Sequence, residues 1–189
     1  MKIQRFLIAA LLITALASTA SAARFYAQPS LAFGEVPDFK AKLGPSFATG
    51  VIFAGKHAVE VEGGIFDTVS RYDSNFKLKV IPVTLNYRYE FPIAKRLSGS
   101  IGVALGVTRH EADYTFVYYS YYPYMGAPFV SRYRATDDAF TAGFQGGLSL
   151  RLNDHFAVTL GARALLTAET GLVSRGTAMI GQLGLNCRL

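Results

Sequence analysis

Residues 97–107 read LSGSIGVALGV, and this stretch alternates strictly between two kinds of residue. One phase is mostly apolar and the other is small and uncharged: Leu97, Gly99, Ile101, Val103, Leu105 and Val107 against Ser98, Ser100, Gly102, Ala104 and Gly106. A period of two residues is that of a β-strand whose two faces meet different surroundings. The second face lacks the dense charge that a soluble sheet turns toward water.

The same alternation recurs along the chain, and no apolar run after residue 22 approaches the ~20 residues of a membrane-spanning helix. Counting every stretch with this period gives eight predicted strands: residues 24–33, 46–53, 59–65, 79–89, 97–107, 138–152, 156–166 and 179–189. Apolar side chains in one phase and small or polar ones in the other are typical of a barrel that faces lipid outward. We therefore predict an all-β fold, an eight-stranded antiparallel up-and-down transmembrane β-barrel.

The predicted connections support this topology, because long and short ones alternate as they do in transmembrane barrels. In chain order, beginning with a long one, they are residues 34–45, 54–56, 67–75, 90–96, 110–136, 153–154 and 168–175. With the N-terminus in the periplasm, every long loop would lie outside the cell. The alternative, a soluble lipocalin-like carrier in the periplasm, would need an apolar interior, and the small polar phase argues against it.

Residues 1–22 have the three parts of a secretory signal peptide: basic Lys2 and Arg5, a twelve-residue apolar run, and the small residues Ala20-Ser21-Ala22. We expect cleavage there, which leaves residues 23–189 as the barrel domain. Without Lys2 and Arg5 the formal net charge falls from +6 to +4. Export argues against a nucleic-acid partner, and no nucleic-acid-binding motif is present.

Composition sets further limits, because 51% of the residues are hydrophobic, 17% are charged and one is Cys. A chain so rich in apolar side chains is not disordered, and a single Cys cannot form an internal disulfide. No His/Cys cluster, phosphate loop or dinucleotide fingerprint is present, so we predict no metal and no cofactor.

The C-terminus carries a pattern like the assembly signal of outer-membrane barrels. It has a polar residue, a glycine two positions later and apolar residues at the third-last and last positions: Gln182, Gly184, Cys187 and Leu189. On these residues and the strand pattern, the chain resembles the small eight-stranded outer-membrane barrel family (OmpA-barrel and OmpX type, grouped with opacity-like porin-family proteins). The chain departs from the family pattern at two of these residues. Cys187 stands where the family usually has an aromatic residue, and Leu189 replaces the usual terminal Phe. The resemblance implies a monomer in the outer membrane of a Gram-negative-type bacterium, in contact with membrane lipids and the barrel-assembly machinery.

Six charged residues fall in the inward phase of the predicted strands: Glu60, Glu62, Arg88, Arg151, Arg163 and Arg188. An Arg facing lipid at mid-membrane would cost about 2–4 kcal/mol, so these side chains need partners in the lumen. The resemblance implies that such pairs plug the lumen. The alternative is a gate that opens for small solutes, as in a channel or porin.

The predicted loop 110–136, HEADYTFVYYSYYPYMGAPFVSRYRAT, holds seven of the eleven Tyr residues. Tyr and Arg are favoured at binding hot spots, which makes the loop a candidate surface for recognition and adhesion. Its candidate residues are Tyr114, Tyr118, Tyr119, Tyr121, Tyr122, Tyr124, Arg132 and Arg134. The alternative is that the flanking strands extend beyond the membrane as a hairpin, with some Tyr residues in the interfacial girdle.

Basic residues also cluster in or beside the long loops: Lys40, Lys42, Arg71, Lys77, Lys79, Arg109, Arg132, Arg134 and Arg175. They are candidates to bind lipopolysaccharide phosphates, or else form a solvated rim.

Some small barrels modify lipid A with His, Ser and an acidic residue. His110 has Glu111, Asp113, Ser120 and Ser131 nearby in sequence, but the spacing specifies no triad. We expect a histidine at the external rim and no enzymatic activity.

Overall fold

The structure is a computed structural model that describes residues 23–35, 39–40, 42–73, 75–118, 129–169, 171 and 176–188. The signal-peptide prediction for residues 1–22 lies outside the described residues. Within them, no helix is long and apolar enough to cross a membrane. Ten strand segments form one antiparallel sheet: β1 (Arg24–Glu35), β2 (Phe39–Lys40), β3 (Lys42–Phe53), β4 (His57–Gly64), β5 (Phe66–Ser70), β6 (Phe76–Pro92), β7 (Leu97–Tyr118), β8 (Phe129–Arg151), β9 (Phe156–Thr167) and β10 (Gly176–Arg188).

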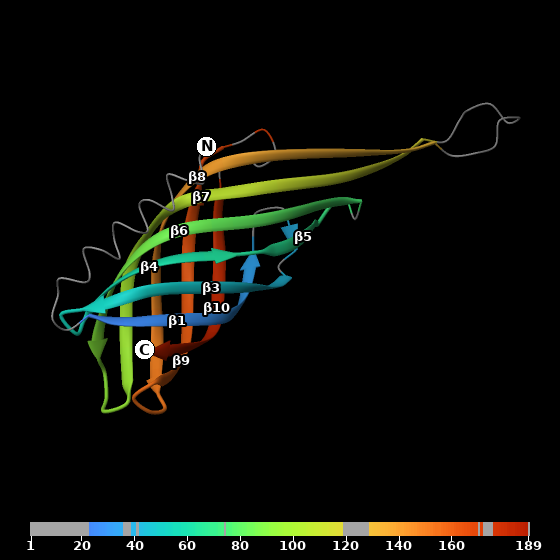
Figure 1. Cartoon of the computed structure of the whole chain (residues 1–189). Coiled ribbons are helices and arrows are strands. Elements are labelled where there is room, and N and C mark those ends of the chain that lie inside the picture. The colour runs from blue at the N-terminus through green and yellow to red at the C-terminus, as the bar shows by residue number, and fades with distance from the viewer. Residues whose placement is uncertain are drawn as a thin grey trace, which may run out of the picture.

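The sheet closes on itself into an eight-stranded barrel (Figure 1). The segments β2 and β3 belong to one strand of the barrel, because β2 pairs with β5 and β3 pairs with β4. Likewise β4 and β5 are two halves of one strand, and both pair with β6. The first and last strands, β1 and β10, pair with each other and complete the cylinder. The predicted fold class is therefore confirmed.

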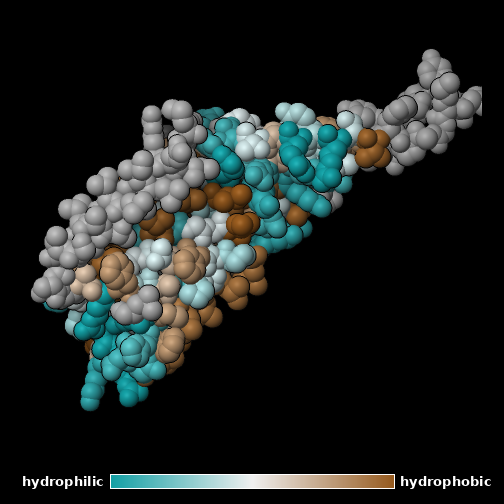
Figure 2. All heavy atoms as spheres, viewed as in Figure 1, coloured by the Kyte–Doolittle hydropathy of each residue, from teal (hydrophilic) through white to brown (hydrophobic). Residues whose placement is uncertain are grey.

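The wall is apolar outside and largely polar or small inside. Along β7, Ile101, Val103 and Leu105 are exposed, whereas Ala104 and Thr108 between and beyond them are buried. Figure 2 shows apolar side chains gathered across the middle of the visible face, with hydrophilic ones toward both ends. This inversion of a soluble core is the arrangement that lipid outside and a polar lumen inside require.

One end of the barrel has tight connections. Ala54 and Gly55, with φ of 48° and 68°, lie at the centre of the β3–β4 turn. Lys56 N donates to Phe53 O at 3.3 Å across it, as in a two-residue hairpin loop whose positive φ angles match the strand twist. The turns at residues 93–96 and 152–155 lie at the same end as the C-terminus (Figure 1), which we call the turn end.

Several strands run further toward the opposite end than the sequence predicted. Of the two interpretations of residues 110–136, a loop is wrong for the flanks and the extended hairpin is confirmed there, because β7 and β8 pair in register from Leu97↔Leu150 to Tyr118↔Phe129. Figure 1 shows these two strands extending past the others, and we call residues 109–118 and 129–138 the β7–β8 ribbon. Of the loops predicted over residues 34–45 and 67–75, the described residues of the first and residues 67–70 of the second are also strand. We call the apolar middle of the wall the apolar belt. Beyond it, charged side chains face outward and have cross-strand partners of opposite charge, such as Asp67↔Lys79. A search for apolar residues in every outward position therefore does not detect these ends of the strands.

Candidate functional site in the barrel lumen

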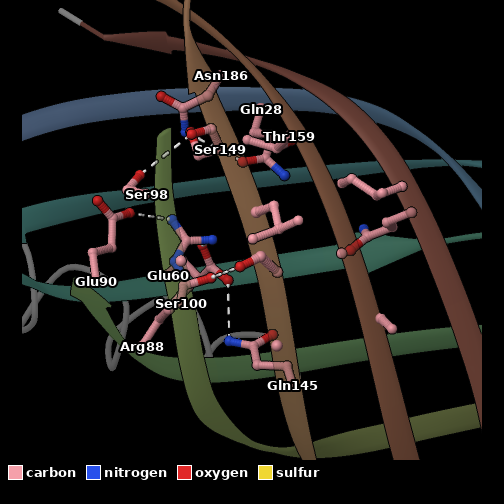
Figure 3. Close-up of a pocket in the computed structure, with 18 of the residues that line it drawn as sticks. Gln28, Glu60, Arg88, Glu90, Ser98, Ser100, Gln145, Ser149, Thr159 and Asn186 are labelled. Atoms are coloured by element: carbon pink, nitrogen blue, oxygen red, sulfur yellow. Dashed lines mark hydrogen bonds and ion pairs between the residues drawn. The ribbon is translucent and has the colours of Figure 1, made fainter. Parts of the chain in front are cut away.

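The lumen contains a hydrogen-bonded layer of polar side chains, which we call the polar layer, and Glu60 on β4 lies at its centre. Its Oε2 accepts a hydrogen bond from the Tyr26 hydroxyl and lies 3.4 Å from Nη1 of Arg88. Its Oε1 accepts from Asn86 Nδ2 at 3.2 Å. The same oxygen accepts from Gln145 Nε2 at 3.5 Å (Figure 3). The glutamate is 3% exposed, so these donors replace the water that its burial removes.

A second carboxylate, Glu62, belongs to the same layer two residues further along β4. Its Oε1 is paired with Nη2 of Arg163 on β9 and accepts a hydrogen bond from Gln182 on β10. Its Oε2 accepts from Asn86 Nδ2 at 3.2 Å, so one amide bridges both glutamates. Side chains from six strands around the barrel thus form one connected network across the lumen.

Little space remains in this layer. The lumen cavity beside it measures about 40 Å³ and is bounded by Gln28, Ser100, Gln145 and Arg163, among others. A water molecule needs roughly 10–15 Å³ of such volume, so the cavity has room for no more than a few water molecules. The free space beside the polar layer is therefore small.

A cluster of buried apolar side chains, the apolar layer, lies in the lumen on the side of the polar layer away from the turn end. Its large members face inward from four strands: Phe66, Leu78, Val80, Leu165 and Ile180. Phe39 joins them and packs against Phe76 with ring centroids 5.6 Å apart. Thr68 donates its hydroxyl hydrogen bond to Leu78 O at 2.8 Å, which satisfies the polar group near this layer. These side chains fall in the inward phase of their strands, but the apolar layer that they form was not predicted from the sequence.

Two of the six predicted lumen charges lie apart from the network. Arg151 and Arg188 are at the turn end, and neither makes an ion pair within the described part of the chain. Arg88 lies between the two regions, because its Nη2 is also 3.1 Å from Glu90 Oε1. The polar layer contains side chains that the analysis missed: Tyr26, Asn86 and Gln145. Their only sequence signal is a polar group in the inward phase of a strand.

The predicted assembly-signal residues are spread over both faces of β10. Gln182 faces the lumen, where its Nε2 also donates to Ser46 Oγ at 2.9 Å. Gly184 is buried, and a Cβ there would lie 2.9 Å from Ser30 Cβ. Cys187 is partly exposed and unpaired with another cysteine, while Leu189 lies outside the described residues.

The residues predicted for surface recognition divide into two groups. Tyr114 packs at the base of the β7–β8 ribbon, where its hydroxyl donates to Asp73 Oδ2 at 2.8 Å. Arg132 and Arg134 are exposed on the ribbon, and both pair with Asp113, at 2.6 and 3.6 Å. The remaining tyrosines have positions or side chains outside the described residues: Tyr118, Tyr119, Tyr121, Tyr122 and Tyr124.

The expectation that His110 lies at the external rim is wrong. Its side chain is 2% exposed and points into the lumen, because position 110 shares the phase of the inward-facing Thr108. Glu111 has the opposite phase, so its side chain lies on the other face of β7. Asp113 shares this outward phase, so neither of these two carboxylates is brought to the histidine, while Ser120 lies outside the described residues.

No protein-family model matches the chain, and no curated protein matches it in sequence. Solved structures match its fold. Neisserial surface protein A superposes with a TM-score of 0.58 at 14% identity, over 88% of this chain and 96% of that one. A major outer membrane protein from Thermus thermophilus gives 0.66 at 8% identity, over 89% and 100%. Ail, the attachment invasion locus protein of Yersinia pestis, gives 0.50 at 13% identity, over 88% and 97%.

These three proteins come from different bacteria and share little sequence with the chain, so the similarity concerns the path of the backbone. That path is a closed antiparallel barrel of eight strands with its apolar side chains outward. The chain therefore has the fold of the small eight-stranded outer-membrane β-barrel proteins.

Proposed function

We propose that this chain is an integral outer-membrane protein with a closed lumen, which acts in the structure of the envelope and in contacts at the cell surface rather than as a solute channel. The observation that carries the proposal is the presence of two different layers in series inside the barrel. The polar layer around Glu60 and Glu62 and the apolar layer around Phe66 and Leu165 both occupy the lumen. A solute would have to disrupt both.

The chemistry of the two layers supports a static closure. Separating Arg163 from Glu62 would leave two charges in a lumen with little water, which is unfavourable. Opening the apolar layer would instead expose the side chains of Phe66 and Leu165 to water. No single local change relieves both layers, because they are held by different interactions.

The experiment is single-channel recording of the refolded barrel in planar bilayers, with each layer opened separately and then together. Glu62→Ala with Arg163→Ala opens the polar layer, and Phe66→Ala with Leu165→Ala opens the apolar layer. We expect negligible conductance for the wild type and for each double variant, and clear conductance for the quadruple variant. A matched control, Phe144→Ala with Leu148→Ala, removes similar volume from the exposed outer face and should stay closed.

Folding of every variant is checked by its migration on unboiled gels, since folded barrels of this kind migrate differently from unfolded chains. Stable conductance through the wild-type protein would contradict the proposal and favour the alternative of a small-solute channel.

A second role, surface contact, is favoured by the β7–β8 ribbon. Its two strands are paired well beyond the apolar belt, and they present Arg132, Arg134 and Tyr133 on exposed positions. A long paired ribbon is already ordered, so presenting its exposed side chains to a partner has a low entropic cost. One protein of this fold is named for attachment and invasion, which agrees with such a role. We propose that the Tyr-rich tip carried by this ribbon contacts a surface ligand or protein.

The test replaces residues 119–128 by an Asn-Gly turn that closes the ribbon, and compares it with a tip of equal length made of Gly and Ser. Adherence of cells displaying each version to a panel of immobilised host and bacterial surface molecules is measured. We expect both replacements to abolish an adherence that the wild type shows. Equal adherence by all three versions would contradict a role of the tip in adherence.

We further propose membrane lipids, including lipopolysaccharide, and the barrel-assembly machinery as partners of a monomeric barrel without enzymatic activity. A concave surface of about 500 Å³ outside the lumen supports the lipopolysaccharide contact. It carries basic and acidic side chains side by side: Lys42, Lys77, Lys79 and Arg134 with Asp67, Glu111 and Asp113. Such a surface suits phosphates cross-linked by divalent cations, since it offers ligands to both ions. Release of lipopolysaccharide by a chelator, measured for wild type and Lys77→Gln with Lys79→Gln, tests this contact.

A further inference from the structure

The lumen opens at the turn end into a cavity of about 240 Å³. Its charged lining consists of five basic side chains and one acidic one: Lys56, Lys95, Arg96, Arg151, Arg188 and Glu90. Ser98 and Ser149 line both this cavity and the smaller one beside the polar layer, so they mark the boundary between the two. We call the larger space the basic cavity.

The positive charge of the basic cavity is not neutralised by its own side chains. Its one carboxylate, Glu90, is already in an ion pair with Arg88 at 3.1 Å. The positive charges of Arg24, Arg88 and Arg151 repel the guanidinium of Arg188. The carboxylate of Glu90 attracts it. In addition, Nε of Arg188 is buried and has no hydrogen-bond partner among the described residues. A buried, unsatisfied donor beside like charges is costly unless an anion occupies the site.

The distribution of charge over the whole barrel domain singles out the same end. Seven basic and three acidic side chains lie at or near the turn end: Arg24, Lys56, Arg88, Lys95, Arg96, Arg151 and Arg188, with Glu60, Glu90 and Asp154. The other charged residues between 23 and 189 are ten basic and ten acidic, so they balance. The net charge of +4 therefore resides at the turn end, and the basic residues expected to dominate the long-loop end are matched there by acidic ones.

We propose that the basic cavity is a binding site for a phosphate group. Arg151 and Arg188 can each present two parallel N–H donors, which match the oxygens of phosphate better than point charges do. The lysines of the two turns, Lys56 and Lys95, add charge at the mouth without fixing an orientation. A concave site lined by one sign of charge also concentrates counter-ions. The volume accommodates a phosphate or a small phosphate ester.

The phosphate could come from a soluble ester in the surrounding water or from the headgroup of an anionic phospholipid in the leaflet at the turn end. Both sources offer the same group to Arg151 and Arg188. The inward position of these two side chains and their place at the barrel end allow access from either.

Isothermal titration of the folded barrel in a neutral detergent tests the site, with glycerol 3-phosphate as the ligand and low ionic strength to limit screening. The test variant is Arg151→Gln with Arg188→Gln. The matched control is Arg71→Gln with Arg109→Gln, two exposed arginines that remove the same charge at the other end of the barrel. We expect one site in the wild type, affinity at least about ten-fold lower in the test variant, and affinity within about two-fold of wild type in the control.

Three results would overturn the proposal: no binding to the wild type, equal loss in both variants, or equally strong binding of nitrate at the same ionic strength. Unboiled gels establish that each variant is folded before titration.

A second measurement identifies the source. Barrels are extracted from bilayers of phosphatidylcholine and phosphatidylglycerol, and retained lipid is detected by native mass spectrometry. Phosphatidylglycerol retained by the wild type and the control, but not by the test variant, assigns the site to a lipid headgroup. No retained lipid on any protein, together with binding of glycerol 3-phosphate, assigns it to a soluble ester.

Discussion

Arg163 on β9 and Glu62 on β4 form an ion pair across the lumen, although β10, β1 and β3 separate their strands in the sheet. The two side chains are 5% and 6% exposed. A contact between such distant strands exists only after the barrel closes, so the pair reports on the closed structure. The ion pair is also connected to Glu60, because the amide of Asn86 donates to both glutamates.

Removing one member of this pair should be far more harmful than removing both. Arg163→Ala leaves Glu62 buried and unpaired, and we expect the free energy of unfolding to fall by about 3–5 kcal/mol. Arg163→Met with Glu62→Gln should lose clearly less, because no uncompensated charge remains. Urea unfolding followed by circular dichroism in detergent micelles measures both. Equal losses in the two proteins would mean that the pair does not carry charge compensation.

Two glycines on opposite faces of the wall should respond differently to the same substitution. A Cβ on Gly106 would overlap the carbonyl oxygen of Val83 on the neighbouring strand, whereas a Cβ on Gly181 has no atom within 4 Å. We expect Gly106→Val to cost about 3 kcal/mol or prevent folding, and Gly181→Val to change stability by less than about 0.5 kcal/mol. Unfolding curves and gel migration test this. Similar tolerance at both positions would contradict the inward assignment of Gly106.

The β7–β8 ribbon should loosen in acid through Asp113. Hydrogen bonding from Arg132, with a smaller effect of the Arg134 charge, holds the pKa of Asp113 below its ordinary value. A carboxyl whose folded-state pKa is depressed stabilises the fold above its unfolded pKa, and this contribution is lost as the pH falls below about 4 through the folded value. We expect amide exchange in residues 112–116 and 131–134, corrected for intrinsic rates, to quicken over that range.

The control for this prediction is Asp113→Asn, whose ribbon should exchange quickly already at neutral pH and show no further change in acid. Glu111→Gln, on the same strand, should behave like the wild type. If Asp113→Asn kept the acid transition, another group would be responsible for it.

The strands across the membrane were predictable from sequence because lipid and lumen impose opposite demands on successive residues. Thus Ile101, Val103 and Leu105 fall on the outer face as their phase predicts. Strand ends were predicted poorly, since Lys77 and Lys79 face outward beyond the lipid, where charge is favourable and the alternation of hydrophobicity reverses.

Within the lumen, the sequence indicated which charges face inward but not which of them meet. Pairing Arg163 with Glu62 depends on the stagger of the closed barrel, which alternation within single strands does not contain. The apolar layer escaped prediction for a different reason. Leu165 and Ile180 lie in the inward phase, but their residue types are the same as those that face lipid. Residue type alone therefore does not indicate that they pack together inside the lumen.

Strand phase decides which side chains of this barrel face lipid and which face the lumen. Spin labels attached to single cysteines at Leu148, Ser149 and Leu150, in a Cys187→Ser protein in lipid bilayers, test it most directly. Leu148 and Leu150 are exposed on the outer face, whereas Ser149 lines the two lumen cavities. We expect the spin labels at positions 148 and 150 to collide frequently with oxygen, which concentrates in lipid. The label at position 149 should instead collide frequently with a water-soluble nickel complex. The opposite pattern, or no alternation among the three positions, would contradict it.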